Sequence, residues 1–219
     1  NNISKTIITS TSEVYGTAKQ VPILETHSLN AQSPYAASKI SADQLALAFY
    51  KSYGLRVGIV RPFNTFGPRQ SARAIIPTII TQLLEKNQTI KLGNLKPTRD
   101  FTYVEDTANA FISTIKTNKI FGEVINFGNS FEISIKDIIE IFKKDFGYNF
   151  NIKLDKKRIR AKNSEVFRLL ASNNKAKKML GWKPKYGGLN GFKKGLEKTI
   201  KWFRDNKNLS QYNSKDYNI

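Results

Sequence analysis

K-T-I-I-T-S-T-S-E-V-Y-G, residues 5–16, is the stretch of sequence that decides the fold. Its first part is a short apolar, β-rich run, and it predicts a buried strand over about residues 3–10. A cluster of hydroxyl side chains follows at the carboxyl end of that strand. Ligands bind at this end of open α/β sheets, so the sequence favours an α/β fold and predicts that Thr11 holds a ligand hydroxyl. An ordinary turn rich in serine and threonine is the alternative.

A tyrosine and a lysine stand four residues apart in the next segment, Tyr35-Ala36-Ala37-Ser38-Lys39. Residues 34–53 are predicted to form a helix that ends at Gly54, so the phenol and the ammonium share one helix face. A nearby cation favours the phenolate form of a tyrosine, which makes Tyr35 a candidate for proton transfer with Lys39 as its partner. The same spacing also occurs in plain surface pairs, so its meaning depends on its surroundings.

A third loop of polar and turn residues comes after another apolar run. Residues 55–61 predict a strand, which leads into R-P-F-N-T-F-G-P-R at 61–69. Parallel strands end at one edge of their sheet. We therefore expect this loop, the hydroxyl cluster and the Tyr35–Lys39 pair to face a single pocket.

The rest of the chain alternates strands and helices without repeats or low-complexity linkers. Strands are expected at 89–92, 99–104 and 123–127, and helices at 74–86, 106–116, 134–146 and 189–206. Ser134 is the expected cap of the helix that stops at Gly147. The last helix places Phe192, Leu196, Ile200 and Phe203 on one side, which is assigned to the core. Residues after Asn206 are polar and are expected to fray.

Composition bounds the class of protein. The chain has 219 residues with 40% hydrophobic content, enough for one large or two small domains. It contains no cysteine, which excludes disulfides and thiolate chemistry. No stretch approaches the roughly 20 apolar residues that span a bilayer, and no signal-like segment opens the chain, so a cytoplasmic location is the default. The one histidine, His27, lies in a polar stretch, and no cluster of metal ligands is expected.

The formal net charge of +19 is typical of nucleic-acid-binding chains. The lysines are spread along the sequence, however, and the densest basic run is K-K-R-I-R-A-K at 156–162. This run could be a solvated surface, a phosphate-binding segment or a nucleic-acid patch. We favour the first two readings over the third.

The motifs resemble those of the extended short-chain dehydrogenase/reductase family that acts on nucleotide sugars. The likeness rests on T-S-T-S-E-V-Y-G, S-P-Y-A-A-S-K, R-P-F-N-T-F-G-P-R, R-D-F-T-Y-V-E-D at 99–106, N-F-G at 126–128, N-S-E-V at 163–166 and L-G-W at 180–182. It extends to about residue 205. Within the family the chain is most similar to the nucleotide-sugar 4,6-dehydratases, especially the GDP-N-acetylglucosamine 4,6-dehydratase of legionaminic acid synthesis.

This resemblance implies the C-terminal part of a Rossmann-like doubly wound parallel sheet plus a smaller α/β substrate-binding domain. Residues 1–70 would complete the dinucleotide-binding domain, 71–205 would form mainly the substrate domain with the chain crossing back, and 206–219 would be a flexible tail. The family's glycine-rich turn, with an acidic residue about 20 positions later, does not occur here. We therefore expect a piece of a longer protein, with strand edges and an apolar face left uncovered.

The resemblance also implies NAD as cofactor and a role for each site residue. Thr11, Tyr35 and Lys39 would oxidise the sugar at C4, and Glu13 would then remove the C5 proton that the ketone acidifies. The expected contacts to the cofactor are Tyr35, Lys39, Pro62 and Thr65. The expected contacts to the substrate are Thr11, Ser12, Asn64, Arg99 and Arg160.

Several alternatives stay open. Ser12 stands where many thymidine-diphosphate-sugar dehydratases have an aspartate acid, so Glu13 is expected to serve as both base and acid. Decarboxylases of UDP-glucuronate also resemble T-S-E-V-Y-G, which makes decarboxylation the second reading and 4-epimerisation the third. An inactive remnant or a basic binding module is the reading from another class. Family members commonly form homodimers through the Tyr–Lys helix, where Ala36, Ala37, Ser41 and Ala42 would permit close contact.

Overall fold

The computed structural model describes residues 3–159 and 161–212, and within them the predicted α/β class is confirmed. The strands are β1 (Thr6–Thr9), β2 (Val57–Pro62), β3 (Asn64–Phe66), β4 (Thr89–Leu92), β5 (Thr98–Tyr103), β6 (Val124–Phe127), β7 (Glu132–Ser134) and β8 (Asn151–Leu154). The α-helices are α1 (Pro34–Tyr53), α2 (Ile75–Leu84), α3 (Val104–Ile115), α4 (Ile135–Lys144), α5 (Asn174–Leu180), α6 (Gly188–Phe203) and α7 (Asn206–Leu209). Short 3-10 helices are η1 (Ser12–Tyr15), η2 (Lys156–Arg158) and η3 (Lys162–Ser164).

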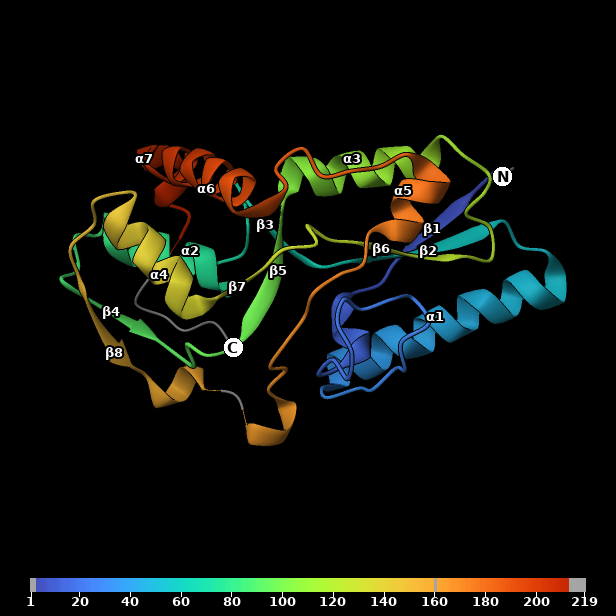
Figure 1. Cartoon of the computed structure of the whole chain (residues 1–219), viewed down its shortest axis with the longest axis horizontal. Coiled ribbons are helices and arrows are strands. Elements are labelled where there is room, and N and C mark those ends of the chain that lie inside the picture. The colour runs from blue at the N-terminus through green and yellow to red at the C-terminus, as the bar shows by residue number, and fades with distance from the viewer. Residues whose placement is uncertain (1–2, 160, 213–219) are drawn as a thin grey trace.

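A parallel sheet of order β1-β2-β6 forms one region of the molecule. Helix α1 covers one face of this sheet, and α3 and α5 cover the other (Figure 1). On the α1 side, Ala46 packs against Val57 and Ile59. On the opposite side, Phe127 and Trp182 meet with ring centroids 5.0 Å apart. Apolar residues thus face helices on both sides, as a parallel sheet requires.

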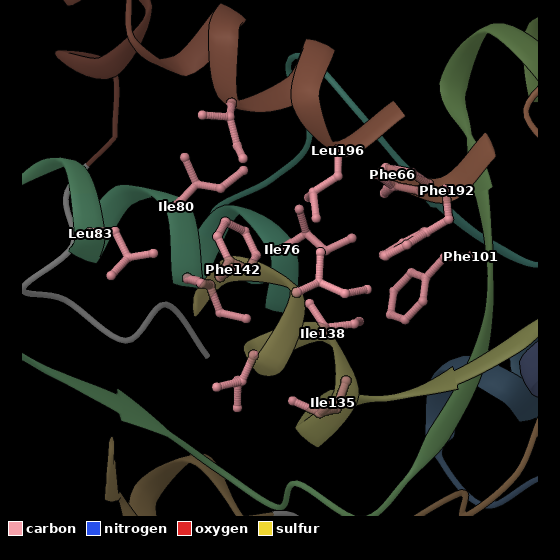
Figure 2. Packing of buried hydrophobic residues seen from close by; sticks show 14 of the residues in the cluster. Phe66, Ile76, Ile80, Leu83, Phe101, Ile135, Ile138, Phe142, Phe192 and Leu196 are labelled. Carbon is pink, nitrogen blue, oxygen red and sulfur yellow. The ribbon is translucent and has the colours of Figure 1, made fainter. Parts of the chain in front are cut away.

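The second region joins a three-stranded sheet of order β3-β5-β7 and the parallel pair β4-β8 to helices α2, α4 and α6. Its core is apolar, and Figure 2 shows side chains from the three helices pointing at one another. Phe192 is fully buried and packs on Phe66, with ring centroids 5.1 Å apart. The predicted core stripe of α6 is confirmed, since Phe192, Leu196, Ile200 and Phe203 are all at most 3% exposed.

Local capping explains why two predicted helices begin and end where they do. Ser33 caps α1 with its hydroxyl, which accepts a hydrogen bond from Ala36 N, and Pro34 occupies the first turn. Gly54 ends α1 in the left-handed conformation at φ 66°, which favours glycine. Ser134 caps α4 in the same way, accepting from Asp137 N. Helix α1 thus has the predicted bounds, whereas α4 begins after its predicted cap Ser134 but ends at Lys144 and not at Phe146.

Other segments differ from the sequence predictions. Strands β3, β7 and β8 and helix α5 were not predicted, because each is short and gains its partners from residues far along the chain. Residues 206–212 form α7 and a final turn where a frayed tail was expected. Leu209 and Tyr212 pack on the apolar core, and the Tyr212 hydroxyl donates to Gln70 O at 3.0 Å. Strand β6, from the later part of the chain, returns to the first sheet. The domain division expected near residue 70 stays a prediction.

The outer side of α1 carries apolar side chains that are open to solvent. Leu45 is 60% exposed, Phe49 44% and Tyr53 80%. Within residues 3–159 and 161–212, β1 pairs with β2 alone, so its other edge has no neighbouring strand. The free edge of β1 agrees with the uncovered strand edge expected from the sequence, whereas helices cover both faces of this sheet. Across the same residues, no helix is long and apolar enough to cross a membrane.

Candidate functional site

A cavity of about 660 Å³ opens where the two regions meet. Of the residues predicted from the sequence, Glu13, Tyr35, Asn64 and Arg99 line it. They come from η1, the start of α1, β3 and β5, so the fold brings together side chains that lie up to 86 positions apart in the chain. These four residues meet the expectation that separate loops face one pocket, whereas Thr11 and Lys39, also expected there, do not line the cavity.

Glu13 is held by the turn on which it stands. The Thr11 hydroxyl accepts a hydrogen bond from Glu13 N at 3.2 Å and so caps η1. Thr11 Oγ1 still carries a proton that can be donated to a ligand. Ser12 is 3% exposed and does not line the cavity.

Tyr35 and Lys39 lie on one face of α1, as their spacing predicts. Lys39 Nζ is 5.9 Å from the centroid of the Tyr35 ring and donates to Thr9 O at 3.0 Å. The carbonyl at the end of β1 thus orients the ammonium beside the phenol. Tyr35 itself is 51% exposed, so its hydroxyl is open to a ligand.

Three arginines line the cavity, Arg73, Arg99 and Arg158, and we call them its arginine wall. Arg99 forms an ion pair with Glu165, with 3.6 Å between Nη2 and Oε1. Arg158 also pairs with Asp155 at 3.3 Å. Arginine forks suit phosphate oxygens, so this wall can hold a diphosphate. Arg160, which the sequence also assigned to substrate, lies outside the described residues.

The residues of the loop at 61–69 that were expected to contact cofactor or substrate are placed differently from one another. Thr65 directs its hydroxyl to the Thr107 hydroxyl at 3.0 Å and to Phe63 O at 3.3 Å, and it does not line the cavity. Pro62 ends β2 and is half-buried. Asn64 lines the cavity, and its Oδ1 atom is buried without a partner among the described residues.

Asp100 fixes the strand that carries Arg99. Its carboxylate is fully buried and accepts hydrogen bonds from the backbone amides of Asn129 at 2.5 Å, Ser130 at 2.9 Å and Ala171 at 3.1 Å. Burial raises the pKa of Asp100 to about 7, and the three amide donors oppose that rise. The carboxylate therefore ties β5, which carries the cavity residues Arg99 and Phe101, to two distant segments of the chain.

Sequence reasoning missed several residues that line the cavity, among them Gln70, Arg73 and Glu165. Arg158 lies in the basic run 156–162, where a phosphate-binding segment was one of the readings. Glu165 stands within the N-S-E-V motif, which gave no sign of its pairing with Arg99. Gln70 and Arg73 follow the loop at 61–69 but belong to no recognised pattern. In the described part of the chain, no group of three or more His, Asp or Glu side chains could hold a metal ion.

Known proteins are similar to this chain in sequence and in fold over most of its length. Human dTDP-D-glucose 4,6-dehydratase is 31% identical over 211 residues, which cover 93% of this chain and 57% of the human protein. The structure of dTDP-glucose 4,6-dehydratase from Bacillus anthracis, in complex with NAD, aligns with a TM-score of 0.83 at 32% identity and covers 93% of this chain and 62% of that one.

Epimerases are similar to a comparable degree. UDP-glucuronic acid 4-epimerase from Bacillus cereus, in complex with UDP-glucuronic acid and NAD, aligns with a TM-score of 0.81 at 30% identity and covers 96% of this chain and 63% of that one. The chain therefore spans about three fifths of the length of these relatives. A family model described as GDP-mannose 4,6 dehydratase matches residues 1–198. On that match, this chain belongs to the GDP-mannose 4,6-dehydratase family, within the wider group of NAD-dependent epimerases and dehydratases.

Proposed function

We propose that the protein containing this chain is an NAD-dependent nucleotide-sugar 4,6-dehydratase that acts on GDP- or UDP-N-acetylglucosamine. The observation that carries the proposal is a carboxylate, Glu13, in the same cavity as Tyr35. A dehydratase needs a second base beside the sugar in addition to the tyrosine that serves the oxidation. The choice of an N-acetylglucosamine nucleotide rests on the sequence resemblance.

The residues for the oxidation step fit a cofactor and a sugar hydroxyl. Tyr35 takes the proton of the C4 hydroxyl, and Lys39, held by its hydrogen bond to Thr9 O, places a positive charge 5.9 Å from the centroid of the Tyr35 ring. Thr11 donates a hydrogen bond to the same sugar oxygen. The O–H of Tyr35 and the N–H groups of Lys39 are the donors that a cofactor ribose needs. NAD, when bound, accepts hydride from C4 and returns it to C6.

Glu13 carries the elimination. The C4 ketone acidifies the neighbouring C5 hydrogen, so the carboxylate can take that proton while the C5–C6 double bond forms and the C6 hydroxyl leaves. The C6 oxygen takes that proton from Glu13 as its bond to carbon breaks, so it leaves as water, and a proton from solvent is added at C5 when hydride returns to C6. Ser12 is too weak an acid for that step, and its hydroxyl is buried away from the cavity. Glu13 therefore serves as both base and acid.

The substrate's diphosphate would lie on the arginine wall. Arg99, with Arg73 and Arg158 nearby, supplies fixed donors for phosphate oxygens, while the sugar reaches Glu13 and Tyr35. Asn64 offers a further polar contact at the sugar end.

A 4-epimerase is the second candidate, because the structure of UDP-glucuronic acid 4-epimerase from Bacillus cereus aligns almost as well as that of the dehydratase. The two reactions differ in their products. A dehydratase yields a sugar nucleotide lighter by one water, whereas an epimerase yields an isomer of unchanged mass. Mass spectrometry after incubation of the purified protein with NAD and each nucleotide sugar separates them.

The Glu13→Gln variant sharpens this test. We expect it to lower the rate of water loss by about 10²–10⁴-fold, because the general base is gone, while C4 oxidation persists. Reduced nicotinamide, seen by its absorbance, should then accumulate in the mixture. Glu197→Gln, an exposed glutamate on α6, is the matched control and should behave as the parent protein does. Equal dehydration by Glu13→Gln and the parent protein would rule out this role.

We further propose that two copies associate through α1. The residues at every fourth position, Ala37, Ser41, Leu45, Phe49 and Tyr53, are all exposed, and most of them are apolar. Small residues at the first two positions permit close helix contact, and large ones at the last three supply apolar area.

A further inference from the structure

A buried polar network joins β2, α1 and η1. Arg61 on β2 is 2% exposed, Asp43 on α1 is fully buried, and Tyr15 at the end of η1 is fully buried. None of these residues lines the cavity. The hydrogen bonds to the Asp43 carboxylate all go to one oxygen, Oδ2, while Oδ1 is buried without a hydrogen-bond partner among the described residues. A buried ion pair holds its geometry through such bonds.

Arg61 contacts both elements that carry proposed catalytic groups. Its Nε and Nη2 donate to Asp43 Oδ2 at 3.0 and 2.9 Å, and its Nη1 donates to the Tyr15 hydroxyl at 2.9 Å. Asp43 lies one turn beyond Lys39 on α1, and Tyr15 lies two residues beyond Glu13. One planar guanidinium therefore sets the distance between the helix that bears Tyr35 and the turn that bears Glu13.

Each end of this link is fixed again by a further contact. The Ser10 hydroxyl donates to Asp43 Oδ2 at 2.9 Å, so β1 and α1 are joined one residue beyond the Lys39 contact to Thr9 O. The Tyr15 hydroxyl donates to Asn126 Oδ1 at 2.7 Å, which ties η1 to β6. The Arg61 guanidinium also lies 4.9 Å from the centroid of the Tyr15 ring.

We propose that Arg61 is a positioning residue that holds Glu13 at its working distance from Tyr35, acting through Tyr15 on one side and Asp43 on the other. The inference rests on the proposed function, since it assigns Glu13 and Tyr35 to successive steps. The network then has two arms. The contact of Arg61 with Asp43, the Asp43 arm, positions Tyr35 and Lys39 for the oxidation, and its contact with Tyr15, the Tyr15 arm, positions Glu13 for the elimination.

Tyr15→Phe tests the second arm alone. It keeps the ring and its packing but removes the acceptor for Arg61 Nη1 and the donor to Asn126. In the protein that contains this chain, we expect C4 oxidation to stay within twofold of the parent rate and KM to be unchanged. Exchange of the sugar C5 hydrogen with solvent deuterium should fall by about 10²-fold, the effect of a misplacement of roughly 1 Å. Tyr50→Phe, on the exposed side of α1, is the matched control.

A second readout does not depend on catalysis. Hydrogen–deuterium exchange of the backbone amides over residues 12–16 should quicken in Tyr15→Phe, while exchange over residues 36–43 stays as in the parent protein. Faster amide exchange in both segments, or an equal loss of both chemical steps, would overturn the proposal in favour of a general structural role. Unchanged C5 exchange would overturn it as well. If the parent protein itself exchanges no C5 hydrogen, the proposed function fails instead, and the amide exchange still decides whether the two arms are separate.

Discussion

The two regions of this molecule bury their interiors in different ways. The region around α2, α4 and α6 is closed by apolar side chains, among them Phe192, which lies beside Phe66 and Phe101 (Figure 2). The region of the β1-β2-β6 sheet, which α1 covers, contains a buried ion pair, Arg61 with Asp43, and a buried phenol, Tyr15. Apolar burial stabilises a fold through the area removed from water. A buried polar network adds less stability than apolar packing does. It fixes the positions of its residues, because each hydrogen bond requires a particular distance and angle between donor and acceptor.

Their helices differ in the same way. Helix α4 buries its isoleucines and Phe142 in the core and exposes its lysines. Helix α1 buries only Ala36, Asp43 and Ala46, and it leaves Leu45 and Phe49 open to solvent. The first pattern belongs to a helix whose partners all lie within the described chain. The second belongs to a helix that holds a site and leaves an apolar face for another surface.

The largest stability effect is expected in the apolar region. Phe192→Ala removes a fully buried ring that packs on Phe66 and Phe101, and it should lower the free energy of unfolding by about 3–5 kcal/mol. Leu189→Ala on the same helix is the control, because Leu189 is 42% exposed and should cost well under half as much. Denaturant titration measures both. Equal losses in the two variants would show that the cluster around Phe192 is not the stabilising core of this region.

An intermediate effect is expected at Asp100, a fully buried carboxylate on β5 of the same region. In Asp100→Asn, either orientation of the amide turns an NH₂ group toward a backbone N–H, so we expect a loss of about 1–3 kcal/mol at pH 5. The loss should also depend on pH, because burial raises the pKa of Asp100 to about 7 in the folded protein. In the unfolded chain this carboxyl ionises near pH 4.

The sign follows from that difference. The stabilisation from the protonated form is fully present below about pH 4 and is lost as the pH rises towards 7. The difference in free energy of unfolding between the parent and Asp100→Asn should therefore shrink between pH 4 and pH 7 and then stay constant. Denaturant titrations across this range measure it, with the surface variant Asp145→Asn as the control. A difference that grows with pH would mean that the amide donors outweigh burial.

The contrast between the regions also explains what the sequence could predict. Helix α1, with Ser33 before it and Gly54 after it, was predicted to the residue, because its caps are local signals. The cavity residues Glu13, Tyr35, Asn64 and Arg99 were found because each lies in a motif that resembles the family's. Contacts made at long range carry no local signal. The pairing of Arg99 with Glu165, and the hold of Asp100 on Ala171, join segments more than 60 residues apart.

The smallest stability effect is expected on the outer face of α1, where the same change should alter assembly. Phe49 is 44% exposed and contacts only the Tyr53 ring among the described aromatic residues, at 5.6 Å between centroids. Phe49→Ser should therefore change the free energy of unfolding of a single copy by no more than about 0.5 kcal/mol. If two copies pair through α1, the variant should shift the mass measured by light scattering from a dimer toward a single chain, while Lys51→Ser leaves it unchanged. A dimer that survives Phe49→Ser would place the interface elsewhere and leave the apolar face of α1 to a different surface. Loss of the dimer at nearly unchanged stability would mean that one face of α1 holds the site residues and the opposite, apolar face contacts a second copy. Helix α4 differs, because its apolar face packs within its own chain.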